Sequence, residues 1–225
     1  MQSNAAVLLL AVVVTSVLFP QPAQPLSFDY PSFSLNPPDI AFQGSASASG
    51  DGVINLTPTL QPGDIRSFVV GRAIYRDPVR LWGGTSSTAD KPVVSNFTTR
   101  FSFAVRPYPG NENDTGDGLA FFLAPYGSDI PAGFCFGHFL GLFNYSSYAP
   151  TMPAGNIPTV AIEFDTFANT NADVQDPPGV HVGIDVNNLK SVVKETWPEI
   201  NTRVGANVSG TISYNAGTTE LSIRN

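Results

Sequence analysis

Apolar and polar residues alternate along most of the chain with a period of two, which is typical of strands that bury one face. The clearest alternating faces are those of Phe97, Thr99, Phe101, Phe103 and Val105, of Val160, Ile162 and Phe164, and of Val180, Val182, Ile184 and Val186. Residues 118–124 are apolar on both faces, as in a strand at the middle of a sandwich. Turn residues separate these segments, and no stretch keeps a 3.6-residue period over a whole helix. The pattern predicts an all-β sandwich of antiparallel sheets.

The first 25 residues have the pattern of a secretory signal peptide. An apolar run over residues 5–19 is too short to span a membrane comfortably, and a proline-rich segment over residues 20–25 follows it. The alternative is a buried core segment. Removing residues 1–25 from the 225 leaves 200 residues, enough for one domain, residues 26–225. No second segment of membrane-spanning length follows, so we expect a secreted chain.

Composition narrows the choice of partners and cofactors. The chain has 11 basic and 18 acidic residues and a net charge of −7, so it offers no basic patch for nucleic acid. Two histidines, His138 and His181, cannot form a three-histidine zinc site. The single Cys135 excludes an internal disulfide and a thiolate metal site, and we expect it to be a small buried hydrophobe. Five N-glycosylation acceptor sequences predict a glycosylated surface, and they begin at Asn55, Asn96, Asn113, Asn144 and Asn207.

Carboxylates gather on one predicted strand. Burial of Val160, Ile162 and Phe164 turns Glu163, Asp165 and Phe167 to the opposite face. Two neighbouring carboxylates on a semi-buried face repel each other and lose hydration, which is costly unless a cation neutralises them. In a second strand, burial of Val180 and Val182 turns His181 to the other face as well, and the loop between the two strands carries Asn169, Asn171, Asp173 and Asp176.

This set of donors suits a calcium site beside a manganese-like transition-metal site. Oxygen ligands favour calcium, and a single imidazole nitrogen among oxygens favours manganese over metals that prefer thiolates. The alternative is an acidic solvated face with a surface histidine, because acidic loops are common.

The same segments carry a resemblance to a known family. The run Glu163-Phe-Asp165-Thr-Phe-Ala-Asn169, with Asp176-Pro and His181-Val-Gly-Ile-Asp, resembles the metal-binding signature of the legume lectins. Further similar segments are Gly71-Arg-Ala-Ile-Tyr75, Pro78-Val-Arg-Leu-Trp82, Asp117-Gly-Leu-Ala-Phe-Phe-Leu-Ala-Pro125 and Phe139-Leu-Gly-Leu-Phe143. Leu26-Ser-Phe28 is similar to the usual start of the mature domain. The resemblance implies a concanavalin-like jelly-roll sandwich that binds carbohydrate and performs no catalysis.

The resemblance also implies ligands for two metal ions. The transition-metal ligands would be Glu163, Asp165, Asp176 and His181. The calcium ligands would be Asp165, Asp176, Asn169 and the main-chain carbonyl of Phe167. Asp173 is an alternative to Asp176 as the metal ligand from this loop. We prefer Asp176 because it is followed by proline and stands five residues before His181, which fits the family better.

Four residues would contact the sugar. The resemblance implies that Asp117, after a cis peptide bond, accepts hydrogen bonds from two adjacent hydroxyls, while Asn169 presents its amide group. Phe167 would pack against the apolar face of the pyranose. His138 stands where the family usually has glycine, so its backbone N–H could still donate to the sugar while its side chain narrows the pocket. The expected partners are glycans, free or on glycoproteins.

The resemblance bears on the rest of the protein too. The family continues with several more strands after residue 225, so we expect a domain incomplete at its C-terminus. It would be a fragment of a longer lectin or of the ectodomain of a lectin receptor kinase, or a truncated gene product. Alternatively, a partner would supply the missing strands. The expected location is the apoplast, with the vacuole, or the cell surface for a receptor, as alternatives. The resemblance further allows two copies to pair as a homodimer.

Two rival functions remain open. Glucanases of similar architecture place Glu-x-Asp-x-x-Glu on one strand, and this chain has Ala168 where the second glutamate would stand, which disfavours a glycoside hydrolase. A lectin-like defence or inhibitor protein without sugar binding is the other alternative, which His138 and the expected incomplete end keep open. No nucleophile-elbow motif supports a serine hydrolase.

Overall fold

The computed structural model describes residues 26–59, 68–86, 89–107, 116–144, 157–170, 174–197, 205 and 207–224. The expected signal peptide, Asn113, Asn171 and Asp173 lie outside these residues. The chain divides into two units, Met1–Pro31 and Ser32–Asn225. In the described part of the first unit, the rings of Phe28 and Tyr30 lie 5.6 Å apart. All strands described below belong to the second unit.

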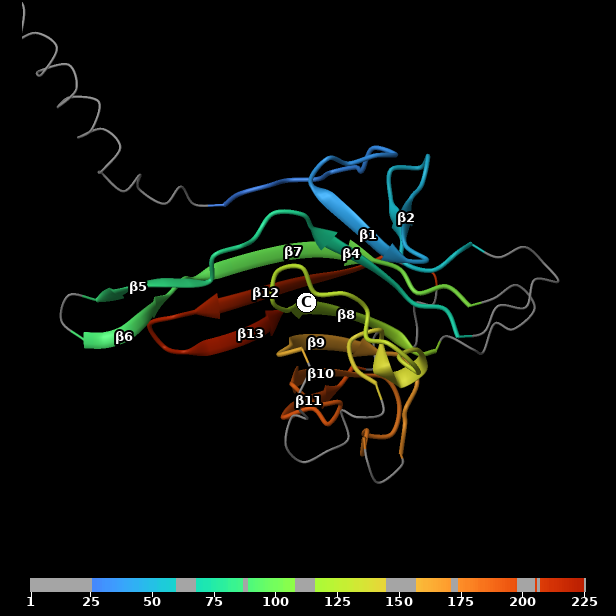
Figure 1. The fold of residues 1–225 in the computed structure, drawn as a ribbon. Helices are drawn as coiled ribbons and strands as arrows, with labels where there is room; N and C mark the ends of the chain where they lie inside the picture. The colour runs from blue at the N-terminus through green and yellow to red at the C-terminus, as the bar shows by residue number, and fades with distance from the viewer. Residues whose placement is uncertain are drawn as a thin grey trace, which may run out of the picture. The chain divides into compact units, whose positions relative to one another are not determined.

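The described part of the second unit is built from antiparallel strands and one short 3-10 helix (Figure 1). Three two-stranded sheets pair β1 (Ile40–Gly44) with β4 (Gly71–Tyr75), β2 (Ser47–Ala48) with β3 (Ile54–Asn55), and β5 (Trp82–Ser86) with β6 (Ala89–Val94). A three-stranded sheet has the order β13 (Glu220–Arg224), β12 (Val208–Asn215), β7 (Phe97–Phe103). A four-stranded sheet has the order β11 (Val193–Thr196), β10 (His181–Val186), β9 (Val160–Asp165), β8 (Gly118–Leu123). The short helix η1 covers Gly137–Phe139. The all-β prediction is confirmed.

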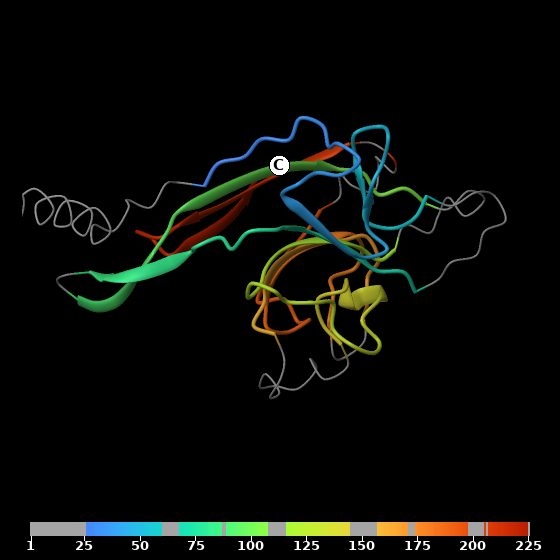
Figure 2. The same cartoon turned by 45° about the horizontal axis from the view of Figure 1, so that its top comes forward.

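Within the four-stranded sheet, β9 is buried on both faces because a different layer covers each one (Figure 2). On one face Ile162 and Phe164 of β9 pack with Ile212 of the three-stranded sheet and the aromatic side chains around it. On the other face Ala161 packs under Phe139, which comes from η1. The alternation predicted for residues 97–103 is confirmed, since odd-numbered residues of β7 are half-buried and even-numbered ones exposed. No helix among the described residues is long and apolar enough to cross a membrane.

The structure departs from the predicted pattern at the ends of β10. Val180, Val182, Ile184 and Val186 were expected to share one buried face. Val180 is buried but precedes the strand, and Val186 is exposed at its end. The side chains that turn away from this face, His181 and Asp185, are instead fully buried. Alternation marks the faces correctly, but a strand covered on both sides buries its polar face as well.

Phe164 should be one of the largest single contributors to stability. It is fully buried, and its ring lies 5.0 Å from that of Phe103 and 5.5 Å from that of Trp197. We expect Phe164→Ala to lower the free energy of unfolding by about 3–5 kcal/mol, as for other buried aromatic truncations. Urea unfolding would measure this, with the exposed Val193→Ala as a control that changes stability by less than about 0.5 kcal/mol. A loss under 1 kcal/mol for Phe164→Ala would contradict this account of the core.

Candidate functional site

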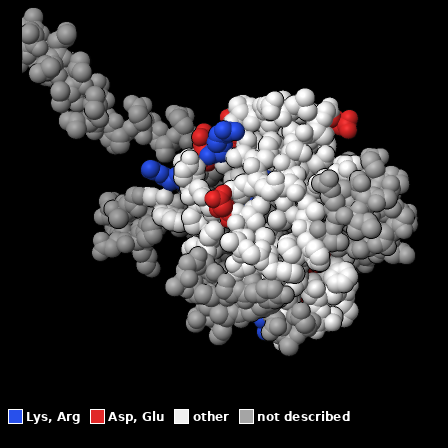
Figure 3. Space-filling view, turned by 45° about the vertical axis from the view of Figure 1, so that its right-hand side comes forward, with Lys and Arg blue, Asp and Glu red and all other residues white. Residues whose placement is uncertain are grey.

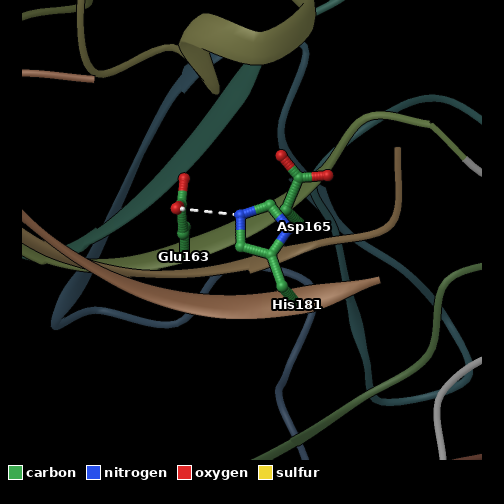
Figure 4. A group of neighbouring side chains, drawn as sticks. All are labelled: Glu163, Asp165 and His181. Atoms are coloured by element: carbon green, nitrogen blue, oxygen red, sulfur yellow. Dashed lines mark ion pairs between the residues drawn. The ribbon is translucent and has the colours of Figure 1, made fainter. Parts of the chain in front are cut away.

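Glu163 and Asp165 of β9 and His181 of β10 converge on one buried point (Figure 4). The register of the two strands pairs His181 with Asp165 and Gly183 with Glu163, so all three side chains leave the same face of the sheet. His181 Nε2 lies 3.3 Å from Glu163 Oε1. The exposed fractions are 4% for Glu163, 2% for Asp165 and 0% for His181. The face that the sequence predicts as semi-buried is therefore almost completely closed to solvent.

Asp176, in the loop before β10, joins this group at its margin. Its Oδ1 lies 3.5 Å from His181 Nε2. The loop is closed by two hydrogen bonds between its ends: Asn169 N–H donates to Asp176 Oδ2 at 2.7 Å, and Asp176 N–H donates to the Asn169 carbonyl at 3.2 Å. Lys194 of β11 donates to the carbonyl of Gln175, the residue before Asp176. The structure thus places Asp176 beside the histidine, while its sequence competitor Asp173 is not among the described residues.

Gly183 has no side chain, and this leaves space on the face of β10 for the side chains of Glu163 and Ser191. A Cβ at this position would overlap both Glu163 Oε1 and Ser191 Oγ. The Ser191 hydroxyl lies within hydrogen-bond distance of Glu163 and 2.9 Å from Asp185 Oδ1, so it links the two carboxyl groups. Sequence reasoning assigned no role to Gly183, Asp185 or Ser191. The available signal was the position of Gly183 and Asp185 at two and four residues after His181, on the same face of β10.

Burial makes it costly in free energy for the carboxyl groups of this site to be ionised. Loss of hydration, with smaller contributions from the nearby Glu163 and Asp176, raises the pKa of Asp165 to about 8. Burial likewise raises the pKa of Asp185 to about 9 and that of Asp176 above its usual range. For His181 burial acts in the opposite direction, but the surrounding carboxylates outweigh it and raise its pKa. Carboxyl groups held this way gain from a cation that neutralises them.

The donor set fits divalent metal ions. Both ring nitrogens of His181 and Oδ1 of Asn169 are buried and have no hydrogen-bond partner in the described part of the chain. Buried polar atoms of this kind cost free energy unless something satisfies them. Carboxylate and amide oxygens suit calcium, and one imidazole among carboxylates suits manganese or a similar transition metal.

Asp117 directly precedes β8, which lies next to β9 and its buried carboxyl groups. The strand register pairs Gly118 with Asp165, and the Gly116–Asp117 peptide bond is cis, the form that the resemblance implies here. Thr166 fixes the Asp117 backbone, since its N–H and its hydroxyl both donate to the Asp117 carbonyl, at 2.8 and 3.0 Å. The loop of η1 approaches from the other side: a Cβ on Gly137 would lie 3.5 Å from Asp117 Oδ2.

Of the other three residues expected to contact sugar, Phe167 and His138 lie near Asp117, and Asn169 lies beside Asp176. Phe167 is 52% exposed, and its N–H donates to Asp165 Oδ1 at 2.6 Å. Its Cβ would lie 3.1 Å from a Cβ added to Gly116, so it contacts the backbone before Asp117. His138 is half-buried, and burial lowers its pKa while Asp117 and Asp176 act to raise it. Asn169 is half-buried too, on the loop closed by Asp176.

The remaining predicted residues lie on other parts of the surface or in the core. Asn96 and Asn207 are exposed, while Asn55 and Asn144 are half-buried. The Asn96 side-chain oxygen accepts a hydrogen bond from Ala216 N–H at 2.7 Å, and the Asn144 amide donates to the Ala132 carbonyl at 3.3 Å. Cys135 is a buried free cysteine, as its apolar neighbours predict.

Comparison with known proteins shows which protein family this chain resembles. The family model of the legume lectin domain matches residues 25–225. The chain is 41% identical over 189 residues to the bark leucoagglutinin of Maackia amurensis, and the aligned region covers 84% of this chain and 60% of that protein. It is 40% identical over 198 residues to the anti-H(O) lectin 1 of Cytisophyllum sessilifolium, covering 88% of this chain and 74% of that one. The chain thus spans 60% of the length of the first of these relatives.

Solved structures agree with these relatives. Lectin UEA-II, solved in complex with galactose, has a TM-score of 0.71 and 36% identity, covering 88% of this chain and 75% of that one. Peanut lectin with a nine-residue peptide has a TM-score of 0.70 and 33% identity, and the match covers 90% of this chain and 81% of that one. Lectin I-B4 from Griffonia simplicifolia, in a metal-free form, has a TM-score of 0.68 and 35% identity, covering 88% and 78%.

The role of Gly183 can be tested directly. We expect Gly183→Ala to displace Glu163 and Ser191 and to weaken divalent-metal binding by about 10- to 100-fold, as for other changes around a ligand. Calorimetric titration of metal-stripped protein with manganese and then calcium would measure the affinities. Gly50→Ala is the matched control, because nothing lies within 4 Å of its added Cβ. Unchanged metal affinity in Gly183→Ala would contradict the role of Gly183 in making room for Glu163 and Ser191.

The raised pKa values predict how the metal-free protein responds to pH. Asp165 titrates near pH 4 when unfolded and at about 8 when folded, so between these values the folded state binds more protons. The free energy of unfolding therefore falls as pH rises, and Asp185 and His181 contribute with the same sign. We expect the melting temperature in excess EDTA to be lower at pH 8 than at pH 5. Asp165→Asn should reduce that difference; an equal difference in both proteins would contradict the prediction.

Proposed function

The chain belongs to the legume lectin family, and on that premise we propose that it binds carbohydrate, without catalysis, when calcium and manganese or a similar transition metal occupy the buried group. The observation that carries the proposal is the closed group of Glu163, Asp165 and His181, with Asp176 beside it and Asp117 at its edge. A family resemblance supplies the ligand class, and this group supplies a physical reason for metal dependence.

The proposed ligands follow from the positions of their donor atoms. Glu163, Asp165, Asp176 and His181 would hold the transition metal. Asp165 and Asp176 would also hold calcium, with Asn169 Oδ1 and the Phe167 carbonyl. Bound metal ions would supply positive charge where burial raises the pKa of the carboxyl groups. Asn169 and Asp176 already bond to each other across the loop, so little further ordering is needed to aim the Asn169 side chain.

The sugar site would be the surface beside these ligands. The Asp117 carboxylate accepts hydrogen bonds from two adjacent hydroxyls, the Asn169 amide group bonds a further hydroxyl, and the exposed ring of Phe167 packs on the apolar face of the pyranose. The His138 backbone N–H donates from the loop of η1, while its half-buried side chain narrows the space available. The galactose complex of lectin UEA-II supports a hexose as the class of ligand.

We also propose the location and state of the protein. The apolar segment over residues 5–19 supports secretion to the apoplast. Among the four acceptor asparagines that the structure describes, the exposed Asn96 and Asn207 are the best candidates for glycosylation. A glycoside hydrolase is disfavoured because Ala168 stands where the second catalytic carboxylate would be needed.

Asp117 provides the sharpest test. We expect Asp117→Asn to weaken sugar binding by at least about 100-fold, because hydrogen bonds to a charged group contribute about 1.5–3 kcal/mol each. A glycan array probed with calcium and manganese would identify the sugar, and calorimetry would compare the variants. Asp51→Asn is the control, an exposed aspartate in the turn between β2 and β3.

Each outcome of this experiment is informative. Binding by the wild type that is lost after chelation, and lost in Asp117→Asn alone, would support the proposal. Binding retained by Asp117→Asn would contradict the site, and binding retained in EDTA would contradict the metal dependence. A folded, metal-loaded wild type that binds no glycan would favour the inhibitor-like alternative. Release of reducing ends from β-glucan, lost in Glu163→Gln, would instead indicate a hydrolase.

A further inference from the structure

Arg72 of β4 is a buried arginine. Its exposed fraction is 5%, and it is the one buried basic residue among the lysines and arginines whose side chains the structure describes. The lysine and arginine side chains in Figure 3 lie mainly toward the edges of the face in view, where their charges meet solvent. A guanidinium keeps its positive charge in proteins, so its burial costs free energy unless nearby groups compensate for the lost hydration.

The guanidinium of Arg72 lies between β8 and the loop of η1. Its Nε and Nη2 both donate to the carbonyl of Gly141, at 3.0 and 2.5 Å. Its central carbon lies 4.8 Å from the centre of the Phe122 ring of β8. Two donors on one carbonyl, together with a cation above an aromatic ring, fix both the position and the orientation of the group. One side chain of β4 therefore contacts β8 and the loop of η1 together.

Gly141 belongs to the loop that reaches the proposed sugar site. Its N–H donates to the Cys135 carbonyl at 2.8 Å, which closes the loop. A Cβ added to Gly137, within the same loop, would lie 3.5 Å from Asp117 Oδ2. His138, whose backbone N–H is proposed to donate to the sugar, follows Gly137 directly. A displacement of Gly141 would therefore reach the sugar-binding end of the loop through a short, closed stretch of backbone.

The hydrogen bonds of Arg72 favour a role in placing this loop. Its Nη1 is buried and has no hydrogen-bond partner in the described part of the chain, a cost in free energy that an apolar side chain of similar length would avoid. The two described hydrogen bonds of its side chain both go to Gly141. Gly141 is also packed closely beside β4, since a Cβ there would overlap Val70 Cγ2. Arg72 and Val70 thus hold the same glycine.

We propose that Arg72 is a positioning residue for sugar binding, which holds the Gly141 carbonyl so that the His138 backbone N–H and the Asp117 carboxylate can contact the same sugar. This inference rests on the proposed function and adds a residue that does not itself touch the ligand. A loop held in its binding conformation before the sugar arrives loses less conformational entropy on binding. The proposed metal ligands lie on β9, on β10 and in the loop between them, so metal binding does not need Arg72.

Arg72→Met tests this role, because it keeps an unbranched apolar chain and removes every donor. We would titrate wild type and variant, loaded with calcium and manganese, with methyl β-galactopyranoside and methyl α-mannopyranoside. We expect the glycoside that binds the wild type to bind Arg72→Met about tenfold more weakly, which is about 1.4 kcal/mol. The affinities for manganese and calcium, measured by calorimetry on metal-stripped protein, should stay within about twofold.

Arg72→Lys is the conservative variant. Its ammonium can still donate to the Gly141 carbonyl but lacks the fixed pair of donors, so we expect a loss of sugar affinity of only about threefold. If Arg72→Met does not fold, the same comparison is made with Arg72→Lys, and sugar affinity equal to that of the wild type would then contradict the proposal.

Hydrogen exchange of the loop gives a readout that needs no sugar. The amide of Gly141 is protected by its bond to Cys135. We expect a peptide covering residues 135–143 to exchange about tenfold faster in Arg72→Met than in the wild type, while peptides of β7 and β12 exchange at unchanged rates. Unchanged exchange in this peptide would contradict the proposal even if sugar affinity fell.

Arg76→Met is the matched control. Arg76 directly follows β4, and its Nη2 donates at 3.2 Å to the carbonyl of Ile40, on β1. The substitution therefore removes the same kind of bond, from a guanidinium to a backbone carbonyl, without touching the loop of η1. Sugar affinity and loop exchange should both stay at the wild-type values. Thermal melting would check that each variant is folded.

The outcomes separate this inference from the proposed function. Sugar affinity within twofold of the wild type in folded Arg72→Met would overturn the inference and leave the sugar site standing. An equal loss of sugar affinity in Arg76→Met would show that affinity follows general stability, and a parallel loss of metal affinity in Arg72→Met would show an effect through the metal ions; either result overturns the inference. If neither glycoside binds to folded, metal-loaded wild type and the glycan array is also silent, the proposed function fails and the inference fails with it.

Discussion

The pairing of β9 with β10 is the constraint on which the rest of the site depends. It places Glu163, Asp165 and His181 on one face of a sheet whose other face is already filled by the aromatic core, so the charged groups cannot turn away from each other. Burial then raises the pKa of the carboxyl groups, and a cation is the partner that relieves their repulsion. The pairing of β9 with β8 on its other side brings Gly118, and with it Asp117, beside Asp165. The proposed metal site and the proposed sugar site are therefore brought together by the two strand pairings of β9.

Hydrogen bonds join the loop between β9 and β10 to the buried carboxyl groups and to Asp117. Asn169 and Asp176 bond across its base, Phe167 donates to Asp165, and Thr166 holds the Asp117 carbonyl. Each of these contacts links a group in the buried cluster, or next to it, to one at the surface. A change in the charge of the buried carboxyl groups would therefore reach Asp117 and Asn169 through these few hydrogen bonds, which is a physical basis for coupling between the proposed metal and sugar sites.

Much of this arrangement could be predicted from the sequence, because its determinants are local. Alternation placed Glu163 and Asp165 opposite Ile162 and Phe164, and the spacing of Asp176 and His181 indicated a shared group. The sequence did not predict how completely the polar face is buried, since that depends on Phe139 and the loop of η1 folding over it from a distant part of the chain. Gly183 and Ser191 were missed for a related reason. The need for a glycine at position 183 is visible only in the folded chain, where Glu163 of the neighbouring strand and the Ser191 hydroxyl fill the space that a Cβ would take.

The loop of η1 connects the three parts of the molecule that matter for binding. Phe139 fills the core, Gly137 approaches Asp117, and Gly141 accepts the hydrogen bonds of Arg72. Because the loop is closed by the hydrogen bond from Gly141 to Cys135 and anchored by the fully buried ring of Phe139, its tip is held beside the Asp117 side chain. Rigid presentation lowers the entropic cost of binding. His138, with a side chain at this tip where the family usually has none, is therefore where the ligand preference of this chain should be decided.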